Sequence, residues 1–266
     1  MLADFHIHST FCDGKNTPEE MVIRAIESGL CSMGFSSHAY TNHDLHCCVK
    51  DVDGYITEIK RLKQKYAHKI QIYLGTEEDR TAFVERDKYD YIIGSNHYAT
   101  VKNKHYPIDS NYSYFTSALK LFNDDELKLA EHYFSTLCEY IQRRKPDIIG
   151  HFDVISKFDE KEQCRFLHNE KYWEIAEYYT RIALNTGCIF EVNTGYINRG
   201  WRSSPCPDFR LLGIIAKEKG KIVLSSDSHN ITHLAGHFDE MKHKLKDIGF
   251  KHTYALFDNK WTKFEI

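Results

Sequence analysis

The stretch Ala3-Asp4-Phe5-His6-Ile7-His8 is a short apolar segment that carries two histidines separated by one residue. In a β-strand, side chains two positions apart point to the same side and lie about 6–7 Å apart along the backbone. Both imidazoles can therefore reach one metal ion. Taken alone, such a pair fits ordinary surface or core histidines at least as well, so the rest of the chain decides its meaning.

Beyond this stretch, short apolar segments alternate with amphipathic ones, the pattern of repeated βα units. The last predicted strand, Thr253–Phe257, would lie at an edge. The unbroken alternation predicts an α/β chain that folds as one barrel-like domain over residues 1–266. The seven principal strands are predicted at Ala3–Ile7, Ser32–Ser36, Ile70–Gly75, Tyr91–Gly94, Asp147–Gly150, Cys188–Val192 and Lys221–Ser225.

The intervening helices have their own signals. Thr17-Pro18-Glu19-Glu20 is a capping box with proline at the first helical position, and Gly29 is a suitable stop. Further helices are predicted at Glu174–Asn185 and Asp208–Lys219, and two long polar loops at Thr41–Asp51 and Lys102–Ser113. Apolar residues spaced by three or four predict one more helical face, formed by Leu127, Ala130, Phe134, Leu137 and Ile141.

Composition excludes several classes of protein. Hydrophobic residues make up 42% of the 266 residues and charged residues 27%, which is enough to build a core and excludes wholesale disorder. The formal net charge of -3 argues against a dedicated nucleic-acid surface. No apolar stretch approaches the ~18 residues that span a bilayer, and the first residues do not resemble a signal peptide. The eight cysteines show no CxxC pair, so we expect reduced thiols and a cytoplasmic protein.

Ionisable side chains follow every principal strand. The carboxyl ends of parallel strands meet at one rim, which is where α/β barrels place their active sites. A ring of imidazoles and carboxylates without thiolates is typical of divalent metal binding. In chain order, the residues are His6, His8 and Asp13; His38; Glu77; His97; His151 and Asp153; Glu191 and Asn193; Asp227 and His229.

At these positions the sequence resembles the polymerase-and-histidinol-phosphatase (PHP) superfamily, over residues 4 to about 237. The resemblance implies a distorted seven-stranded (β/α) barrel of the TIM-like type and a metal-dependent phosphoesterase. It is carried by Asp4-Phe5-His6-Ile7-His8-Ser9, Asp13-Gly14, His38, Gly75-Thr76-Glu77, Gly94-Ser95-Asn96-His97, Gly150-His151-Phe152-Asp153, Glu191-Val192-Asn193-Thr194 and Ser226-Asp227-Ser228-His229.

Within the superfamily the chain is most similar to the bacterial histidinol-phosphate phosphatases. The features are Tyr106-Pro107-Ile108-Asp109, Lys157, and the arginine-bearing segment after Glu191-Val192-Asn193-Thr194. This likeness implies hydrolysis of L-histidinol phosphate to L-histidinol and phosphate, a step of histidine biosynthesis, through attack of a metal-bridging hydroxide. The alternative within the superfamily is a nucleotide or another small phosphate ester as substrate.

The resemblance also implies three divalent ions, which could be zinc, manganese or iron. Many relatives place a histidine or aspartate one position after Asp13, where this chain has Gly14, so the third site departs from the usual pattern. The implied ligands are His6, His8, Glu77 and Asp227 for the first ion; Glu77, His97 and His151 for the second; Asp13, His38 and His229 for the third.

Phosphate recognition calls for cationic side chains. Arg199, Arg202 and Lys157 follow predicted strands and are the candidates, with Tyr98 as an aromatic contact and Asp109 as a counter-charge for a cationic substrate. Around the metals, Asp153 and Asn193 are expected to orient a ligand imidazole or a bound water. The residues expected to carry the catalysis are Glu77, Asp227, His229 and Asp153.

Other interpretations remain open from the sequence. An amidohydrolase also begins with His-x-His but often uses a carboxylated lysine after the fourth strand, where this chain has Ser95-Asn96-His97. A binding module without activity would be expected to lack ligands. The loop with His43, His46, Cys47 and Cys48 fits a lid or plain surface better than a zinc knuckle. The expected partner is a small phosphate ester, with neither nucleic acid nor membrane.

Overall fold

The computed structural model describes residues 2–163 and 165–266, and within them seven parallel strands form one sheet, in the order β1-β2-β3-β4-β7-β8-β9. Neighbouring strands pair in parallel throughout, for example Ser32 with Gln71 and Phe190 with Ile222. The strands are β1 Ala3–Asp4, β2 Ser32–Phe35, β3 Gln71–Asp79, β4 Tyr91–Ser95, β7 Ile148–Ile149, β8 Ile189–Asn193 and β9 Ile222–Ser225.

The sheet curves back on itself, so that β1 and β9 meet. Beyond the ends of both strands, Ile7 and Ser228 form a parallel bridge. The His8 amide donates to the Ser228 carbonyl at 2.8 Å, and the Ser228 amide donates to the His6 carbonyl at 3.0 Å. The predicted α/β barrel is therefore confirmed, and its seam lies beside the histidine pair.

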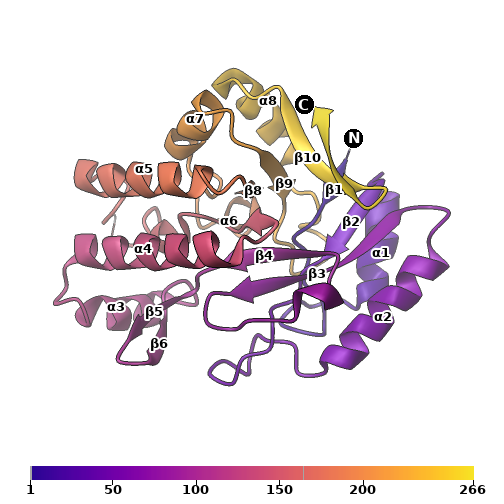
Figure 1. Ribbon diagram of the computed structural model, residues 1–266, viewed down its shortest axis with the longest axis horizontal. Coiled ribbons are helices and arrows are strands. Elements are labelled where there is room, and N and C mark those ends of the chain that lie inside the picture. Colours follow the sequence, from indigo (N-terminus) through magenta and orange to yellow (C-terminus); the bar gives the residue numbers. More distant parts are fainter. Residues whose placement is uncertain (1, 164) are drawn as a thin grey trace.

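The helices lie around the outside of the barrel, with α1 and α2 on one side and α4 and α5 on the opposite side (Figure 1). The capping box at Thr17 is present, because its hydroxyl accepts from the Glu20 amide and Glu20 accepts in return. Short 3-10 turns occur at Arg86–Lys88 and Val154–Ser156. The α-helices are α1 Pro18–Glu27, α2 Val52–Lys65, α3 Tyr112–Lys120, α4 Glu126–Arg144, α5 Glu170–Leu184, α6 Gly195–Asn198, α7 Phe209–Lys217 and α8 Phe238–Ile248.

The predicted edge strand near the C-terminus is real but does not join the barrel sheet. β10, His252–Phe257, pairs with β11, Lys260–Glu265, in a separate antiparallel hairpin. Its Leu256 carbonyl accepts from the hydroxyl of Ser32, the first residue of β2, at 2.7 Å. The hairpin thus packs at the amino-terminal ends of the barrel strands, opposite the rim that carries the histidines.

The predicted loop Lys102–Ser113 was wrong over about half of its length. β5, Tyr98–Val101, and β6, Lys104–Pro107, form an antiparallel hairpin, and α3 already begins at Tyr112. Lys102 and Asn103 both have positive φ, 51° and 59°, as a tight two-residue hairpin turn requires. The other predicted loop, Thr41–Asp51, is irregular, as expected.

The barrel interior is packed around Tyr91. Its hydroxyl donates to the carbonyls of Phe5, at 2.6 Å, and Phe35, at 3.1 Å. Two glycines make room for its ring, because a Cβ on Gly75 would lie 2.2 Å from Tyr91 Cζ and one on Gly34 would lie 2.4 Å from Tyr91 Oη. The interior is therefore a filled core that supports the rim above it.

No helix in the described part of the chain is long and apolar enough to cross a membrane. The cysteines that the structure describes are free thiols, and Cys164 lies outside the described residues.

Candidate metal centre

The first group of predicted ligands comes together at the seam of the barrel. His6 Nε2 lies 3.2 Å from Glu77 Oε2 and 3.6 Å from Asp227 Oδ1. His8 Nε2 lies 3.6 Å and 3.3 Å from the same two oxygens. Four ligand atoms around a zinc ion at about 2.1 Å are separated by about 3.4 Å, so this spacing suits one tetrahedral ion.

The second group gathers around the other oxygen of Glu77. His97 Nε2 lies 3.2 Å and His151 Nε2 3.0 Å from Glu77 Oε1, and the two nitrogens are 3.2 Å apart. The Ser95 hydroxyl donates to the same oxygen at 2.7 Å. Glu77 is therefore shared between the first and second groups, as the family pattern implies.

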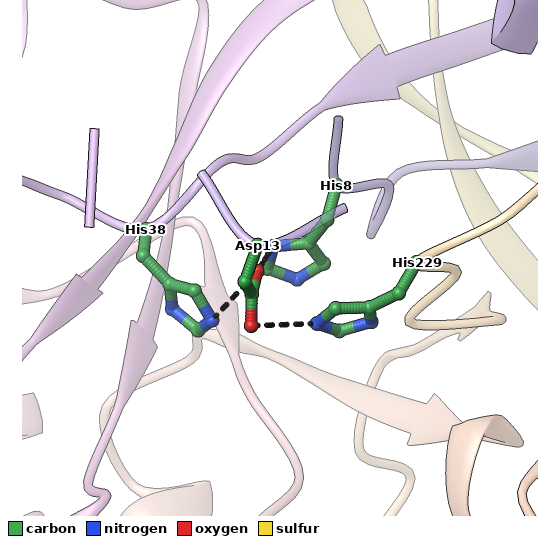
Figure 2. Close-up of side chains that lie close together, drawn as sticks. All are labelled: His8, Asp13, His38 and His229. Atoms are coloured by element: carbon green, nitrogen blue, oxygen red, sulfur yellow. Dashed lines mark ion pairs between the residues drawn. The ribbon is translucent and has the colours of Figure 1, made fainter. Parts of the chain in front are cut away.

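The third group surrounds Asp13, which lies between three imidazoles (Figure 2). Asp13 Oδ1 is 3.8 Å from His38 Nε2 and 3.7 Å from His8 Nδ1, and Asp13 Oδ2 is 3.4 Å from His229 Nε2. His38 also places its Nδ1 2.9 Å from Glu77 Oε2. The four side chains His8, Asp13, His38 and His229 have the spacing of a metal site, with Gly14 contributing no ligand.

Unpartnered nitrogen atoms show that these residues fit a metal. His6 Nε2 and His8 Nε2 are fully enclosed, yet neither has a hydrogen-bond partner among the described residues. Buried polar atoms are almost always paired, because leaving one unpaired costs about 1–3 kcal/mol. Both nitrogens face the carboxylates of Glu77 and Asp227, which is the arrangement of a set of metal ligands.

The buried carboxylates of the first ligand group also favour a positive charge between them. Burial opposes ionisation of Glu77 and Asp227, but the facing cations outweigh it, led by His6 for Glu77 and by Arg199 for Asp227. The pKa of each carboxyl is therefore held well below its usual range. Burial likewise opposes protonation of His6, but Glu191, Glu77 and Asp227 together raise its pKa well above the ordinary value.

A cavity of about 360 Å³ opens over these groups. Arg199 and Lys157 line it, together with Tyr98, while His6 and His8 lie fully buried beneath it. The cavity thus combines a floor of potential metal ligands with two cationic side chains in its wall.

The family model for the PHP domain matches residues 4–195. The chain belongs to the PHP domain family. A Schizosaccharomyces pombe relative named "Probable histidinol-phosphatase" is 29% identical, over 97% of this chain and 95% of its own. The Bacillus subtilis protein named "Histidinol-phosphatase" is 26% identical, over 85% and 92% respectively.

A solved structure with the same fold is histidinol phosphate phosphatase from Lactococcus lactis, complexed with zinc, L-histidinol and phosphate. It superposes with a TM-score of 0.74 at 18% identity, covering 98% of each chain. At this identity the likeness shows the fold of the PHP domain, and it agrees with the barrel described above.

Three further residues hold the ligands of this PHP domain in place, and of these the sequence analysis named Glu191 and Asn193 but missed Asp79. Glu191 Oε1 accepts from His6 Nδ1 at 2.5 Å, and its Oε2 accepts from the His151 amide at 2.7 Å. Asn193 donates to Glu191 at 3.1 Å, so it orients a ligand indirectly. Asp79 accepts from the His97 amide at 2.8 Å and lies 3.2 Å from its Nδ1. The signal for Asp79 was available, since Glu77 and Asp79 share one face of β3.

Two predicted site residues lie elsewhere. Arg202 is enclosed and faces Asp153 Oδ2 and Asp208 Oδ2, each at 3.2 Å. Asp153 also accepts from the Asp208 amide at 3.0 Å. Neither Arg202 nor Asp153 lines the cavity over the PHP metal ligands. Asp153 Oδ2 therefore orients Arg202 and the loop at Asp208, and no hydrogen bond joins Asp153 to a ligand imidazole among the described residues.

The two cationic residues of the cavity wall are firmly held. Arg199 donates to the Asp227 carbonyl and to Asp227 Oδ2, both at 2.9 Å, and its guanidinium stacks over Tyr196. Lys157 donates to the Asp109 carbonyl, and its ammonium lies over the rings of Tyr196, Phe158 and Trp201. These contacts position both charges at the cavity and limit their motion.

The loop Thr41–Asp51 forms another part of the cavity wall through His46, Cys47 and Cys48. Within the described residues, no group of three or more side chains with metal-ligand spacing includes them. Tyr98 donates to Asp44 of this loop at 2.8 Å.

Proposed function

We propose that residues 1–266 act as a single PHP-type domain that hydrolyses L-histidinol phosphate to L-histidinol and phosphate. The relatives named histidinol-phosphatase support this substrate, and they match most of the chain. A cytoplasmic location is part of the proposal, since the cysteines lack any paired spacing.

One observation carries the proposal: the ligand groups around Glu77 and Asp13 adjoin a cavity whose wall holds Arg199 and Lys157. Uncatalysed hydrolysis of a phosphate monoester is among the slowest of reactions, and clustered metals with fixed cations are an effective solution. An amidohydrolase has no such need for two cationic side chains next to the metals.

The proposed cofactor is a cluster of three divalent ions, and the residues that would hold them are those of the three groups. His6, His8, Glu77 and Asp227 would hold the first, Glu77, His97 and His151 the second, and Asp13, His38 and His229 the third. Such ions lower the pKa of a water molecule and neutralise phosphoryl oxygens. Imidazole and carboxylate ligands accept zinc, manganese or iron.

The side chains of the wall complete the site. Arg199 has a planar guanidinium that can donate two parallel hydrogen bonds to phosphoryl oxygens. Lys157 adds a second positive charge, fixed by the three aromatic rings around it. Tyr98 offers an aromatic surface to the alcohol portion of the ester. Glu191 and Asp79 keep the imidazoles of His6 and His97 in the orientation that binding requires.

The deciding experiment assays the metal-loaded protein against four substrates: histidinol phosphate, p-nitrophenyl phosphate, a nucleoside monophosphate and an N-acyl amino acid. We expect kcat/KM to be highest for histidinol phosphate. Elemental analysis of the same preparation should find close to three ions per chain.

Arg199→Gln should lower kcat/KM for every phosphate ester, by about 10- to 100-fold, because a charged hydrogen bond to phosphate is lost. Arg210→Gln is the control, since Arg210 pairs with Glu170 and Glu177 on the outer helices. Equal, feeble turnover of all four substrates would remove the histidinol phosphate assignment, and a preference for the nucleotide would replace it.

A further inference from the structure

The two cations of the cavity wall come from different segments of the chain. Lys157 directly follows the 3-10 turn Val154–Ser156 after β7, and Arg199 directly follows α6 after β8. Both lie over the ring of Tyr196, the Lys157 ammonium 5.1 Å and the Arg199 guanidinium 4.7 Å from its centre. Two positive charges that share one ring repel each other. Their common position therefore depends on contacts that join the two segments.

Arg202 makes such contacts from outside the cavity. Its Nη1 donates to Asp153 Oδ2 at 3.2 Å and to the Ser156 hydroxyl at 2.9 Å, both in the segment after β7. Its Nη2 donates to the Ser204 hydroxyl at 2.9 Å and to Asp208 Oδ2 at 3.2 Å, both in the segment after β8. One guanidinium thus bridges the two segments.

The bridge ends next to both cations. Ser156, which accepts from Arg202, is the residue before Lys157. On the other side, the Arg202 amide donates to the Tyr196 carbonyl at 3.3 Å, and the Tyr196 ring lies under the guanidinium of Arg199. A shift of Arg202 would therefore displace Lys157 and Arg199 relative to each other.

The stability of the fold does not explain why this core position carries a charge. Arg202 is 3% exposed, and Asp153 is fully buried. Taking two charges out of water costs about as much as their attraction returns, so apolar side chains of similar size would stabilise the core at least as well. A buried ion pair can instead fix one arrangement of the chain.

We propose that Arg202 is a positioning residue: by joining the segments after β7 and β8, it holds Lys157 and Arg199 where both bind one phosphoryl group. This inference rests on the proposed function, because it takes the ligand of the two cations to be a phosphate ester. Arg202 thus contributes to phosphate binding through its neighbours, and not by the direct contact that the sequence suggested.

The test measures the Kd of inorganic phosphate for the metal-loaded protein by isothermal titration calorimetry, in the wild type and in Arg202→Lys. Lysine keeps a positive charge beside Asp153 and Asp208, but its single nitrogen lacks the planar fork that reaches both segments. We expect Kd to rise by about 10-fold, because the binding groups are no longer held in place. Elemental analysis should find the metal content unchanged.

The double variant Asp153→Asn, Arg202→Gln removes both charges of the pair together and leaves neither one buried alone. It should raise the Kd of phosphate in the same way. The test therefore does not depend on whether one particular substitution folds.

A second background distinguishes positioning from a general effect on the fold. In Lys157→Met one cation is absent, so Arg202→Lys should raise Kd there by less than about 2-fold. Arg144→Lys is the matched control, because Arg144 of α4 pairs with the buried Glu78; it should lower Tm and leave Kd as in the wild type. If Arg202→Lys raises Kd equally in both backgrounds, or not at all, the inference falls.

Substrate assays on the same proteins separate this inference from the proposed function. If the wild type hydrolyses other phosphate esters but not histidinol phosphate, and Arg202→Lys weakens phosphate binding in the wild-type background alone, the proposed function fails and the inference stands. If the wild type turns over histidinol phosphate and Arg202→Lys leaves the Kd of phosphate unchanged, the inference fails and the proposed function stands.

Discussion

Glu77 is the central ligand of the candidate metal centre. Its Oε2 faces His6, His8 and His38, and its Oε1 faces His97 and His151. Because the Glu77 carboxylate belongs to both the first and the second ligand group, removal of its charge alters both groups.

Glu77→Gln should abolish most metal binding and lower phosphatase activity by at least about 100-fold, because a neutral amide is a poor ligand for a divalent cation. His8→Ala should act in the same direction. Metal content and kcat are measured on the same sample, and wild-type values for both in either variant would contradict the ligand assignment.

Glu78→Gln is the matched control for that experiment. Glu78 is the next residue of β3, points to the other face and binds Arg144 and Tyr140 of α4. We expect this variant to melt at a lower temperature while the folded fraction keeps its metal.

Asp4 supplies a prediction of pH dependence. Burial raises its pKa from 3.8 to about 6, despite hydrogen bonds from Ser226, His6 and Ala235. Between these values the folded state holds a proton that the unfolded state has released, so the Asp4 contribution to stability decreases as the pH rises. The size is about 3 kcal/mol, at 1.36 kcal/mol for each pKa unit.

The measurement is the free energy of unfolding of the wild type minus that of Asp4→Asn, from denaturant titrations at several pH values. We expect this difference to fall as the pH rises from about 4 to 6 and then to level off. A difference that stays flat, or that grows with pH, would show that Asp4 is ionised in the fold throughout.

At the scale of elements, β3 joins the metal centre to the outer layer. Its alternation sends Glu77 and Asp79 toward the ligands and Glu78 toward α4. Further down the same strand, Gly75 leaves space for the ring of Tyr91 from β4.

Gly75→Ala should destabilise the protein by about 1–3 kcal/mol, because the added methyl overlaps a fixed aromatic ring in a filled core. Gly213→Ala should have the opposite effect on stability. Gly213 lies inside α7 with open space around its Cα, so alanine should stabilise by roughly 0.5–1 kcal/mol through helix propensity. Chemical denaturation of both variants checks the pair, and a neutral Gly75→Ala would contradict the described packing.

The individual strands and hairpins show which parts of the fold the sequence could and could not predict. The principal strands were found because their apolar runs are buried and bounded by helices with clear caps. The β5–β6 hairpin was missed because it is short and half-exposed, and its turn is Lys102-Asn103 in place of the expected Asn-Gly. The β10–β11 turn, Asp258-Asn259, is of the same kind, with φ values of 49° and 58°.

For the site, the predictable part was the set of residues directly after strands, since topology alone brings those ends together. The partners of those residues were not predictable. Arg202 and Asp153 have the residue types of a phosphate binder and a supporting acid, yet they neutralise each other away from the cavity. Only the three-dimensional path of the chain determines which cationic side chain pairs with which carboxylate.

At the scale of the whole molecule, the ligand groups draw on segments from both ends of the chain, and removal of the metal should therefore lower overall stability. Without cations, Asp13, Glu77 and Asp227 repel one another in a largely enclosed space. Binding to the folded state alone stabilises by about 4 kcal/mol at a metal concentration 1,000 times Kd.

Calorimetry should show a lower Tm after chelation, and added zinc or manganese should restore Tm and activity together. Glu77→Gln is the control and should respond weakly to either treatment. An unchanged Tm in protein shown by elemental analysis to be metal-free would contradict a role of the centre in holding the fold.

The seam between His6 and Ser228 has a consequence for how the molecule is made. A ribosome delivers the histidine pair at the very start of translation, but Asp227 follows 221 residues later. The ligand set proposed for the first ion is therefore incomplete until Asp227 has been synthesised and the barrel has closed at this seam.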